Sequence, residues 1–414
     1  MLTTEQNELL CSTNPGTPMG ALFRRFWLPV LLPSELPEPD CPPIRVRILG
    51  EDLVAFRDTD GSVGFFTQAC PHRGASLFFG RNKERGLRCV YHGWKFDVTG
   101  ACVDMPSEPP ESNFKSRVSV RSYSSAEFGG LVWIYMGPKE TQPPVPQYDW
   151  TLQDYPNLKV YKWMQDCNYT QAIESYIDTV HVNFLHRTFG GPARPRRFDR
   201  DAAPVLQIKE TDFGFVYGGR RPAGDQYYWR ITPLVLPSFV SIPNQGWDGN
   251  ANFVVPVDDE HSWWFTVSPP GIRPAAGAPE REHVVLTPGT WRQTHNRDND
   301  YFIDREIQRT YNYTGLPGNR VQDAMVTESM GAIPDRAKEH LGTTDRAIIF
   351  WRRQLMRLAS ELESGIEPKI LSEASLFRVR PIDVITKETN LLPLWEADHA
   401  EHLKQAVLPV PIVS

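Results

Sequence analysis

The sequence predicts an α+β protein with two domains, an antiparallel β domain followed by a larger domain in which a sheet is flanked by helices. Three features lead to this prediction. Apolar residues alternate with polar ones from Ile44 onward, which is typical of half-buried strands. A proline-rich connector at 137–146 then marks a domain boundary. Beyond it, strand-like runs lie between helical patterns.

The expected division is a helical segment at 1–40 that packs on the second domain, a β domain at 41–140 and a larger domain at 141–414. Strands of the first domain are expected at Ile44–Ile48, Leu53–Phe56, Val63–Thr67, Leu87–Tyr91, Trp94–Asp97 and Gly130–Met136. Strands of the second are expected at 205–209, 213–217, 227–232, 252–257 and 262–267, with helices at 298–311, 319–330 and 345–362.

Length and composition exclude several classes of protein. The chain of 414 residues carries a net charge of −6, which argues against a nucleic-acid binder. No apolar run approaches the ~20 residues that span a membrane, and the N-terminus lacks the pattern of a signal peptide. The six cysteines are too sparse for a disulfide framework, so core or metal-ligand roles are expected. We therefore expect a cytoplasmic protein that binds neither membranes nor nucleic acid.

A stretch at 167–187 combines an apolar helical pattern with titratable side chains. Its apolar residues recur every three or four positions, and no proline or glycine interrupts them before Gly190. Glu174, Asp178, His181 and His186 lie within this pattern. Two imidazoles and a carboxylate suit a non-haem ferrous site. From this stretch alone, a surface helix with two incidental histidines is an equally good interpretation.

The cysteines and histidines of the β domain form a more specific pattern. Cys70-Pro71-His72 is followed, after a gap of sixteen residues, by Cys89-Val90-Tyr91-His92. Each short segment thus offers one thiolate and one imidazole, which is the ligand set of a Rieske [2Fe–2S] cluster. A structural zinc site is the alternative, but zinc fingers usually place like ligands in the same loop. The pattern therefore favours the cluster.

These motifs resemble those of the Rieske-type non-haem iron aromatic ring-hydroxylating oxygenases. C-P-H-R-G at 70–74 and C-V-Y-H-G-W at 89–94 match the family's cluster signature, and Asp178-Thr179-Val180-His181 with His186 matches its iron motif. The segments 171–186 and 322–336 resemble the phthalate-dioxygenase-like branch of oxygenase (alpha) components. This resemblance implies a helix-grip (START-like) catalytic domain at 141–414, a Rieske [2Fe–2S] domain at 41–140, and a mononuclear Fe(II).

A mononuclear iron site needs two imidazoles and one carboxylate on one face of the metal. His181 and His186 would diverge by about 140° on an ideal helix, so either the helix distorts or the ligands approach from a wide angle. The resemblance places the carboxylate at Asp323, with Glu328 and Asp335 as alternatives.

Asp178 lies one helical turn before His181 and is expected to orient that imidazole rather than to bind iron. The resemblance implies that Asp178 carries electrons from His92 of the partner subunit to His181. Head-to-tail contacts of this kind close into a ring, so a trimer or hexamer is expected.

Substrate contacts are less readable in the sequence. Ser175 precedes the iron motif, and Arg220 with Arg221 could clamp a carboxylate, although an exposed pair of charges at a hairpin is an equal alternative. The resemblance implies oxidation of an aromatic carboxylate, such as a phthalate-like or phenoxybenzoate-like acid, by O2 through ring dihydroxylation. Aryl ether cleavage or O-demethylation is the alternative, and an electron carrier without its own chemistry is a remote one.

No dinucleotide-binding G-x-G-x-x-G pattern is found in the chain. The resemblance therefore implies a separate NADH-dependent reductase of the FMN and [2Fe–2S] type.

Overall fold

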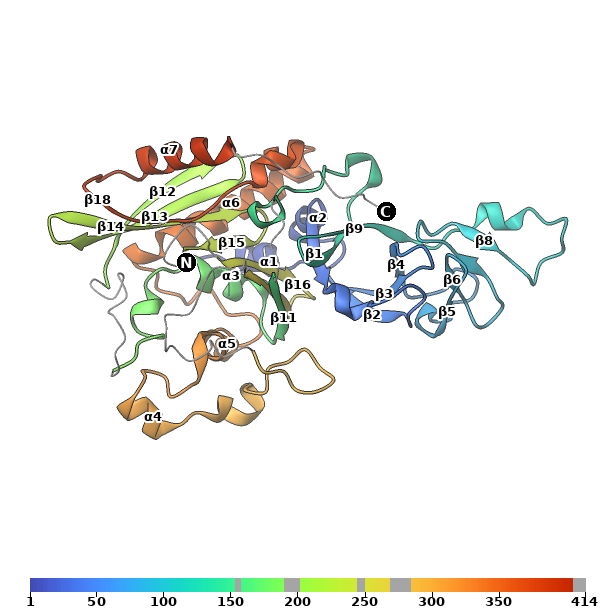
Figure 1. Cartoon of the computed structure of the whole chain (residues 1–414), viewed down its shortest axis with the longest axis horizontal. Helices are drawn as coiled ribbons and strands as arrows, with labels where there is room; N and C mark the ends of the chain where they lie inside the picture. Colours follow the sequence, from blue (N-terminus) through green and yellow to red (C-terminus); the bar gives the residue numbers. More distant parts are fainter. Residues whose placement is uncertain (153–157, 190–201, 244–249, 269–283, 405–414) are drawn as a thin grey trace.

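The computed structural model describes residues 1–152, 158–189, 202–243, 250–268 and 284–404. It confirms the predicted α+β class. Two lobes are visible in Figure 1, a small β lobe and a larger lobe in which helices cover a curved sheet. Among the described residues, no helix is long and apolar enough to cross a membrane.

The small lobe contains two antiparallel sheets. A six-stranded sheet has the order β1-β10-β9-β4-β3-β2, and a four-stranded sheet has the order β5-β6-β7-β8. The strands of the larger sheet are β1 (Trp27–Leu31), β2 (Ile44–Ile48), β3 (Glu51–Arg57), β4 (Val63–Thr67), β9 (Ser122–Phe128) and β10 (Leu131–Tyr135). The short strands of the smaller sheet are β5 (Arg81–Asn82), β6 (Leu87–Arg88), β7 (Lys95–Phe96) and β8 (Cys102–Asp104).

The larger lobe is built on an eight-stranded antiparallel sheet. Seven strands follow the order β11-β17-β16-β15-β14-β13-β12, and the eighth, β18, pairs with β14. Its strands are β11 (Lys159–Gln165), β12 (Val205–Thr211), β13 (Gly214–Ala223), β14 (Gln226–Val235), β15 (Phe239–Ile242), β16 (Asn250–Pro256), β17 (Ser262–Ser268) and β18 (Ile382–Thr386). Its helices are α3 (Tyr169–Ile177), α4 (Arg305–Thr310), α5 (Gly318–Ser329), α6 (Arg346–Glu363) and α7 (Leu391–Leu403).

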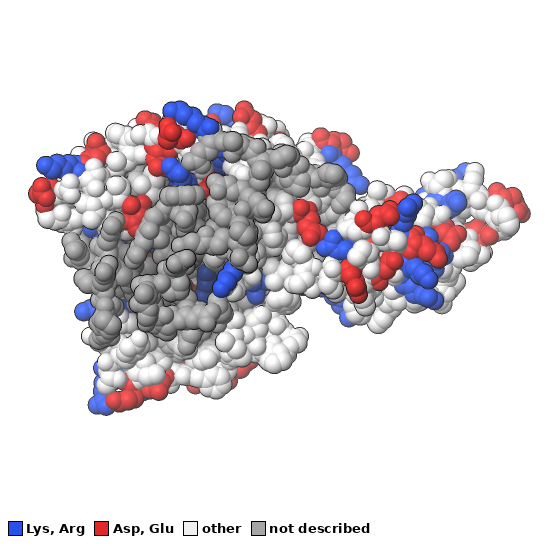
Figure 2. Space-filling view, viewed as in Figure 1, with Lys and Arg blue, Asp and Glu red and all other residues white. Residues whose placement is uncertain are grey.

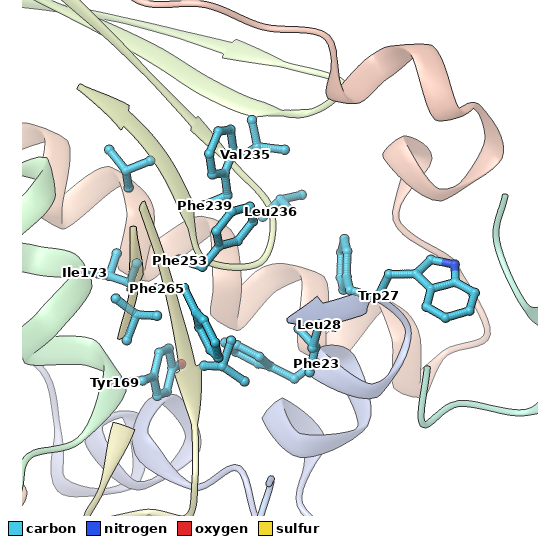
Figure 3. Packing of buried hydrophobic residues seen from close by; sticks show 14 of the residues in the cluster. Phe23, Trp27, Leu28, Tyr169, Ile173, Val235, Leu236, Phe239, Phe253 and Phe265 are labelled. Atoms are coloured by element: carbon cyan, nitrogen blue, oxygen red, sulfur yellow. The ribbon is translucent and has the colours of Figure 1, made fainter. Parts of the chain in front are cut away.

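The N-terminal segment contacts both lobes through α1 (Thr4–Cys11), α2 (Pro18–Arg24) and β1. Strand β1 extends the six-stranded sheet by pairing Trp27 with Tyr135 of β10. Helix α2 packs on the larger lobe, where the ring of Phe23 lies 4.9 Å from that of Tyr169, measured between centroids. Figure 3 shows these side chains in one continuous apolar core with Ile173 and residues of the sheet.

Three predicted elements are wrong in extent. The strands expected at 87–91 and 94–97 are only two residues long, because Cys89–Gly93 forms a tight turn instead. The helix expected at 298–311 is a 3-10 helix, Arg297–Phe302, followed by the short α4. Asp304 separates the two, because its carboxylate caps α4 by accepting hydrogen bonds from the N–H groups of Glu306 and Ile307.

Acidic and basic side chains are interspersed over the small lobe rather than segregated (Figure 2).

Inside the protein, one ion pair joins β11 to the N-terminal segment. The ammonium of Lys162 lies 2.8 Å from the carboxylate of Glu35 and 4.3 Å from the ring centroid of Trp263. Burial lowers the pKa of Lys162, and Glu35 only partly offsets this effect.

We expect Glu35→Gln to lower the free energy of unfolding by about 3 kcal/mol, because it leaves a buried ammonium without a counter-charge. Chemical denaturation followed by tryptophan fluorescence measures this loss. The double variant Glu35→Gln/Lys162→Met should recover most of it. Equal stability of Glu35→Gln and the wild type would contradict the role given to this pair.

Candidate metal centres

The two cysteine–histidine segments of the small lobe fold into matching turns. The N–H of Gly74 donates to the carbonyl of Cys70 at 2.9 Å, and the N–H of Gly93 donates to the carbonyl of Cys89 at 3.1 Å. Both glycines have positive φ, +77° and +78°, a conformation that residues with a side chain adopt only at a cost. The turns bring one cysteine and one histidine from each segment to the same place.

The imidazoles of His72 and His92 face each other, with ring centroids 4.3 Å apart. Each presents a buried Nδ1 atom that has no hydrogen-bond partner in the part of the chain that the structure describes. The ring of His72 stacks on Trp94 at 4.2 Å, which fixes its orientation. Two orphaned nitrogens beside two buried thiols fit a metal cluster, since unpaired buried polar atoms are costly.

The surroundings of Cys70 disfavour its thiolate, so a bound cation would be needed to offset them. Burial raises the pKa of Cys70 to about 11, and the neighbouring Cys89 adds to this effect. Burial, with the adjacent His72 and Arg73, lowers the pKa of His92 and so favours its neutral, metal-binding form. Cys70, His72, Cys89 and His92 thus match the donor set of a Rieske [2Fe–2S] cluster, two thiolates and two neutral imidazoles.

The predicted helix at 167–187 is wrong beyond Ile177, where α3 ends. Asp178 leaves the helical conformation (ψ 119°), and its Oδ1 accepts a hydrogen bond from the N–H of Val180 at 2.6 Å. This side-chain bond competes with continuation of the helix. A 3-10 helix, His181–Asn183, follows the turn. The distortion removes the angular divergence that an ideal helix would impose on His181 and His186.

His181, His186 and Asp323 converge from the segment after α3 and from α5. Their ligand atoms all lie within 4.8 Å of one another. Asp323 Oδ1 is 3.2 Å from His186 Nε2 and 3.9 Å from His181 Nε2, and it is buried without a hydrogen-bond partner among the described residues. This arrangement fits a two-histidine, one-carboxylate site for mononuclear iron.

The opposite nitrogen of each imidazole faces an oxygen acceptor, within hydrogen-bond distance at His186 and at a longer distance at His181. His181 Nδ1 lies 3.5 Å from Asp178 Oδ2, and His186 Nδ1 lies 2.7 Å from the side-chain oxygen of Gln322. An acceptor at Nδ1 keeps the proton on that atom and leaves Nε2 as the metal-binding lone pair. The two Nε2 atoms are the ones directed at Asp323.

Electrostatics favour the ionised forms of both acids. Burial opposes ionisation of Asp323, but His186 and, to a lesser extent, His181 and Arg320 outweigh it and lower the pKa of the carboxyl. Burial likewise opposes ionisation of Asp178, and hydrogen bonds from His181 and Val180 outweigh it, so its pKa is also lowered. Both carboxylates are therefore negative at neutral pH.

The two alternative acids are occupied elsewhere. Glu328 is buried, and its Oε2 accepts a hydrogen bond from the hydroxyl of Tyr301 at 2.5 Å. Asp335 pairs with Lys338 at 2.9 Å on the surface. Among the three carboxylates considered, only Asp323 lies with the histidines.

Comparison with known proteins agrees with both centres. A family model described as "Rieske [2Fe-2S] domain" matches residues 26–124, and one described as "LigXa C-terminal domain like" matches residues 134–391, more than half of the chain. The phthalate 4,5-dioxygenase oxygenase subunit of Pseudomonas putida is 38% identical over 392 residues, covering 88% of each chain. The chain belongs to the Rieske non-haem iron oxygenases.

Other relatives of this oxygenase act on different compounds. The 3-chlorobenzoate-3,4-dioxygenase oxygenase subunit of Comamonas testosteroni is 37% identical, covering 91% of this chain and 93% of the relative. The 5,5'-dehydrodivanillate O-demethylase oxygenase subunit of Sphingobium sp. is 31% identical, with coverage of 98% and 93%. A solved structure of the NdmA QL mutant of Pseudomonas putida CBB5 shares the fold, with a TM-score of 0.59, 18% identity and coverage of 90% and 100%.

The predicted substrate contacts of the oxygenase do not lie together. Arg220 and Arg221 are inside β13, where consecutive side chains point to opposite faces, so they do not form one clamp. Arg220 donates to the backbone carbonyl of Thr389 at 2.7 Å, whereas Arg221 is fully buried. The hydroxyl of Ser175 donates to the carbonyl of Ala172 at 2.8 Å, within α3.

Arg221 and Arg230 instead contact the turn that carries the iron motif. Arg221 donates to the carbonyl of Thr179 at 2.8 Å, and Arg230 donates to its hydroxyl at 3.2 Å. A Cβ atom at Gly219 would lie 3.2 Å from the Thr179 methyl group and from Arg221 Nη1, so the strand packs closely against this turn. The sheet therefore fixes the turn between Asp178 and His181.

Gln322 was missed in the sequence, although it directly precedes the predicted ligand Asp323. Its amide nitrogen donates to the carbonyl of Leu316 at 3.1 Å, which fixes the amide with its oxygen toward His186. The sequence indicated this role only through the position of a polar residue next to a metal ligand on a predicted helix. Such a position is weak evidence that a residue orients the site.

We expect Gln322→Leu to weaken iron binding by about 10- to 100-fold, because the imidazole of His186 loses the acceptor that orients it. Competition with a chelator at graded concentrations measures the affinity. Gln308→Leu on α4 is the matched control and should retain wild-type affinity. An unchanged affinity in Gln322→Leu would remove this residue from the site.

Proposed function

We propose that this chain is a terminal oxygenase component that oxidises an aromatic carboxylate with O2, using electrons that originate from NADH. The observation that carries the proposal is the convergence of His181, His186 and Asp323 in a chain that also has a Rieske domain. When bound there, ferrous iron supplies the activation of O2. An electron carrier would have no use for the second centre.

The substrate class is supported by relatives that are named for phthalate and 3-chlorobenzoate. Ring dihydroxylation is the reaction that we favour. The relative named as an O-demethylase supports a second candidate, the cleavage of a methoxy or aryl ether group, because one iron centre serves both outcomes.

The partners follow from the same family. The relatives are named as oxygenase subunits, so we propose a separate reductase, of the FMN and [2Fe–2S] type, as the electron donor. A cytoplasmic location is part of the proposal, and six cysteines without disulfides support it.

Self-association completes the electron path that we propose. Strand β6, which leads into the Cys89 turn, and helix α5, which carries Asp323, lie in different lobes well apart from each other (Figure 1). Asp178 retains 26% exposure of its side chain, and His92 is also partly exposed. We therefore propose that Asp178 accepts a hydrogen bond from His92 of the partner subunit in a trimer or hexamer.

The test is a screen of aromatic acids for stimulated O2 uptake with a generic reductase and NADH. We expect phthalate, 3-chlorobenzoate or phenoxybenzoate to stimulate uptake and to yield a dihydrodiol that contains two atoms of labelled oxygen. Formaldehyde release from methoxylated acids would favour the second candidate. If no aromatic acid stimulated uptake, the proposed substrate class would be wrong.

A further inference from the structure

Arg320 lies on α5, one helical turn before Asp323, so both side chains are on the same side of the helix. Its guanidinium carbon lies 4.8 Å from the ring centroid of Trp163, which is fully buried. Nη1 donates to the hydroxyl of Tyr176 at 2.8 Å. The indole and the hydroxyl hold the planar group in a single orientation.

Most of the hydrogen-bonding capacity of Arg320 is unused. A guanidinium has five N–H donors, and the bond to Tyr176 is the one that Arg320 makes with the described residues. No carboxylate of the described chain lies within 4.0 Å of it. By contrast, the buried Arg336 and Arg352 of the same lobe pair with Glu174 at 3.3 and 2.8 Å.

Asp323 does not serve as the counter-charge. Its Oδ1 is directed at His186 Nε2 at 3.2 Å, and its interaction with Arg320 is electrostatic without a close contact. A half-buried cation beside the iron ligands, with donors in a planar fork, is suited to bind a carboxylate through two hydrogen bonds.

The side chains beside Arg320 are aromatic. Tyr176 of α3 and Trp264 of strand β17 contact each other with ring centroids 5.0 Å apart, and both are buried. The guanidinium of Arg320 therefore lies at the edge of an aromatic cluster rather than among other charged groups.

From these contacts we infer that Arg320 binds the carboxylate of the aromatic substrate and determines the preference for acids over neutral aromatics. The inference rests on the proposed function and deepens it. Arg320 is a specificity-determining residue in this scheme, and it takes the role for which the sequence had suggested Arg220 and Arg221.

The test compares 3-chlorobenzoate with the neutral isostere 3-chlorobenzamide, using calorimetric titration of the iron-loaded holoenzyme and steady-state O2 uptake. In Arg320→Gln, we expect the Kd and KM for the acid to rise about 30-fold or more, because the substrate carboxylate loses its charged, hydrogen-bonded partner. The Kd for the amide should change by less than about 3-fold. Arg320→Lys, which keeps the charge but loses the fork, should be intermediate.

Two further variants separate this role from a structural one. Arg309→Gln on α4, an exposed arginine, should leave both constants unchanged. Tyr176→Phe should weaken acid binding by only about 2- to 10-fold, the value of one hydrogen bond. Iron content and the visible spectrum show whether each variant is folded and loaded.

The outcomes distinguish the two proposals. Suppose that the wild type responds to the acid, but that Arg320→Gln keeps the wild-type ratio of acid to amide affinity, or binds both ligands more weakly by the same factor. Arg320 then does not bind the carboxylate, and the proposed function stands. If the wild type responds to no aromatic acid, the proposed substrate class is wrong and this inference is overturned with it.

Discussion

Replacing Asp178 by asparagine is expected to reduce coupled turnover by roughly 100-fold or more while both metal centres remain loaded. Asp178 is not directed at the position between His181, His186 and Asp323, since its Oδ2 faces the far nitrogen of His181 at 3.5 Å. Asparagine has nearly the same shape and can retain the bond to Val180. It lacks the negative charge that polarises His181. In the proposed assembly, the same charge strengthens the hydrogen bond that Asp178 accepts from an imidazole N–H of a neighbouring subunit.

The measurement has three parts: iron content, the rate of cluster reduction by the reductase, and single-turnover product formation. In Asp178→Asn, iron content and the rate of cluster reduction should match the wild type, and only single-turnover product formation should fall. Asp335→Asn is the matched control, because Asp335 is an exposed acid of the same lobe. Normal single-turnover product in Asp178→Asn would show that the carboxylate does not couple the two centres.

Replacing Asp323 by alanine is expected to remove the mononuclear iron and abolish product formation. The Oδ1 atom of Asp323 lies 3.2 Å from His186 Nε2 and 3.9 Å from His181 Nε2, whereas Asp178 faces the opposite nitrogen of His181. Two imidazoles without a carboxylate form an incomplete site. The iron content should fall by about one per chain, whereas the visible absorption of the Rieske cluster should persist.

Glu328→Gln is the informative comparison for this variant. Glu328 is on the same helix, but its carboxyl contacts Tyr301 and the backbone of Asp166, and burial raises its pKa. Glutamine keeps the size of this side chain and one acceptor oxygen, and Glu328 contacts neither iron-site histidine, so iron binding should persist. If Glu328→Gln lost the mononuclear iron and Asp323→Ala retained it, Glu328 rather than Asp323 would be the carboxylate ligand.

The cluster site was readable in the sequence because its four residues lie in two short segments of the small lobe. The spacing of Cys70, His72, Cys89 and His92 alone indicated the chemistry, and local turns suffice to bring the pairs together. The α+β class was readable for a similar reason, since a strand such as Ile44–Ile48 shows its two-residue period directly.

The iron site was only partly readable because it depends on contacts between distant segments. His181 and His186 could be identified in the sequence. The apolar period nevertheless predicted a helix that continues past Ile177, because periodicity does not reveal a side chain such as Asp178 that accepts a hydrogen bond from a nearby backbone N–H. Asp323 was chosen among three acids by resemblance. Gln322 and Arg320 act through neighbours more than 130 residues earlier in the chain, which a local pattern does not show.

Metal analysis of the purified wild-type protein is the most direct test of the account. Two centres require about three irons and two acid-labile sulfides per chain, two irons in the cluster and one bound by His181, His186 and Asp323. A brown protein with this ratio is the predicted result. About two irons after reconstitution with excess Fe(II) would contradict the mononuclear site, and a colourless zinc protein would contradict both centres.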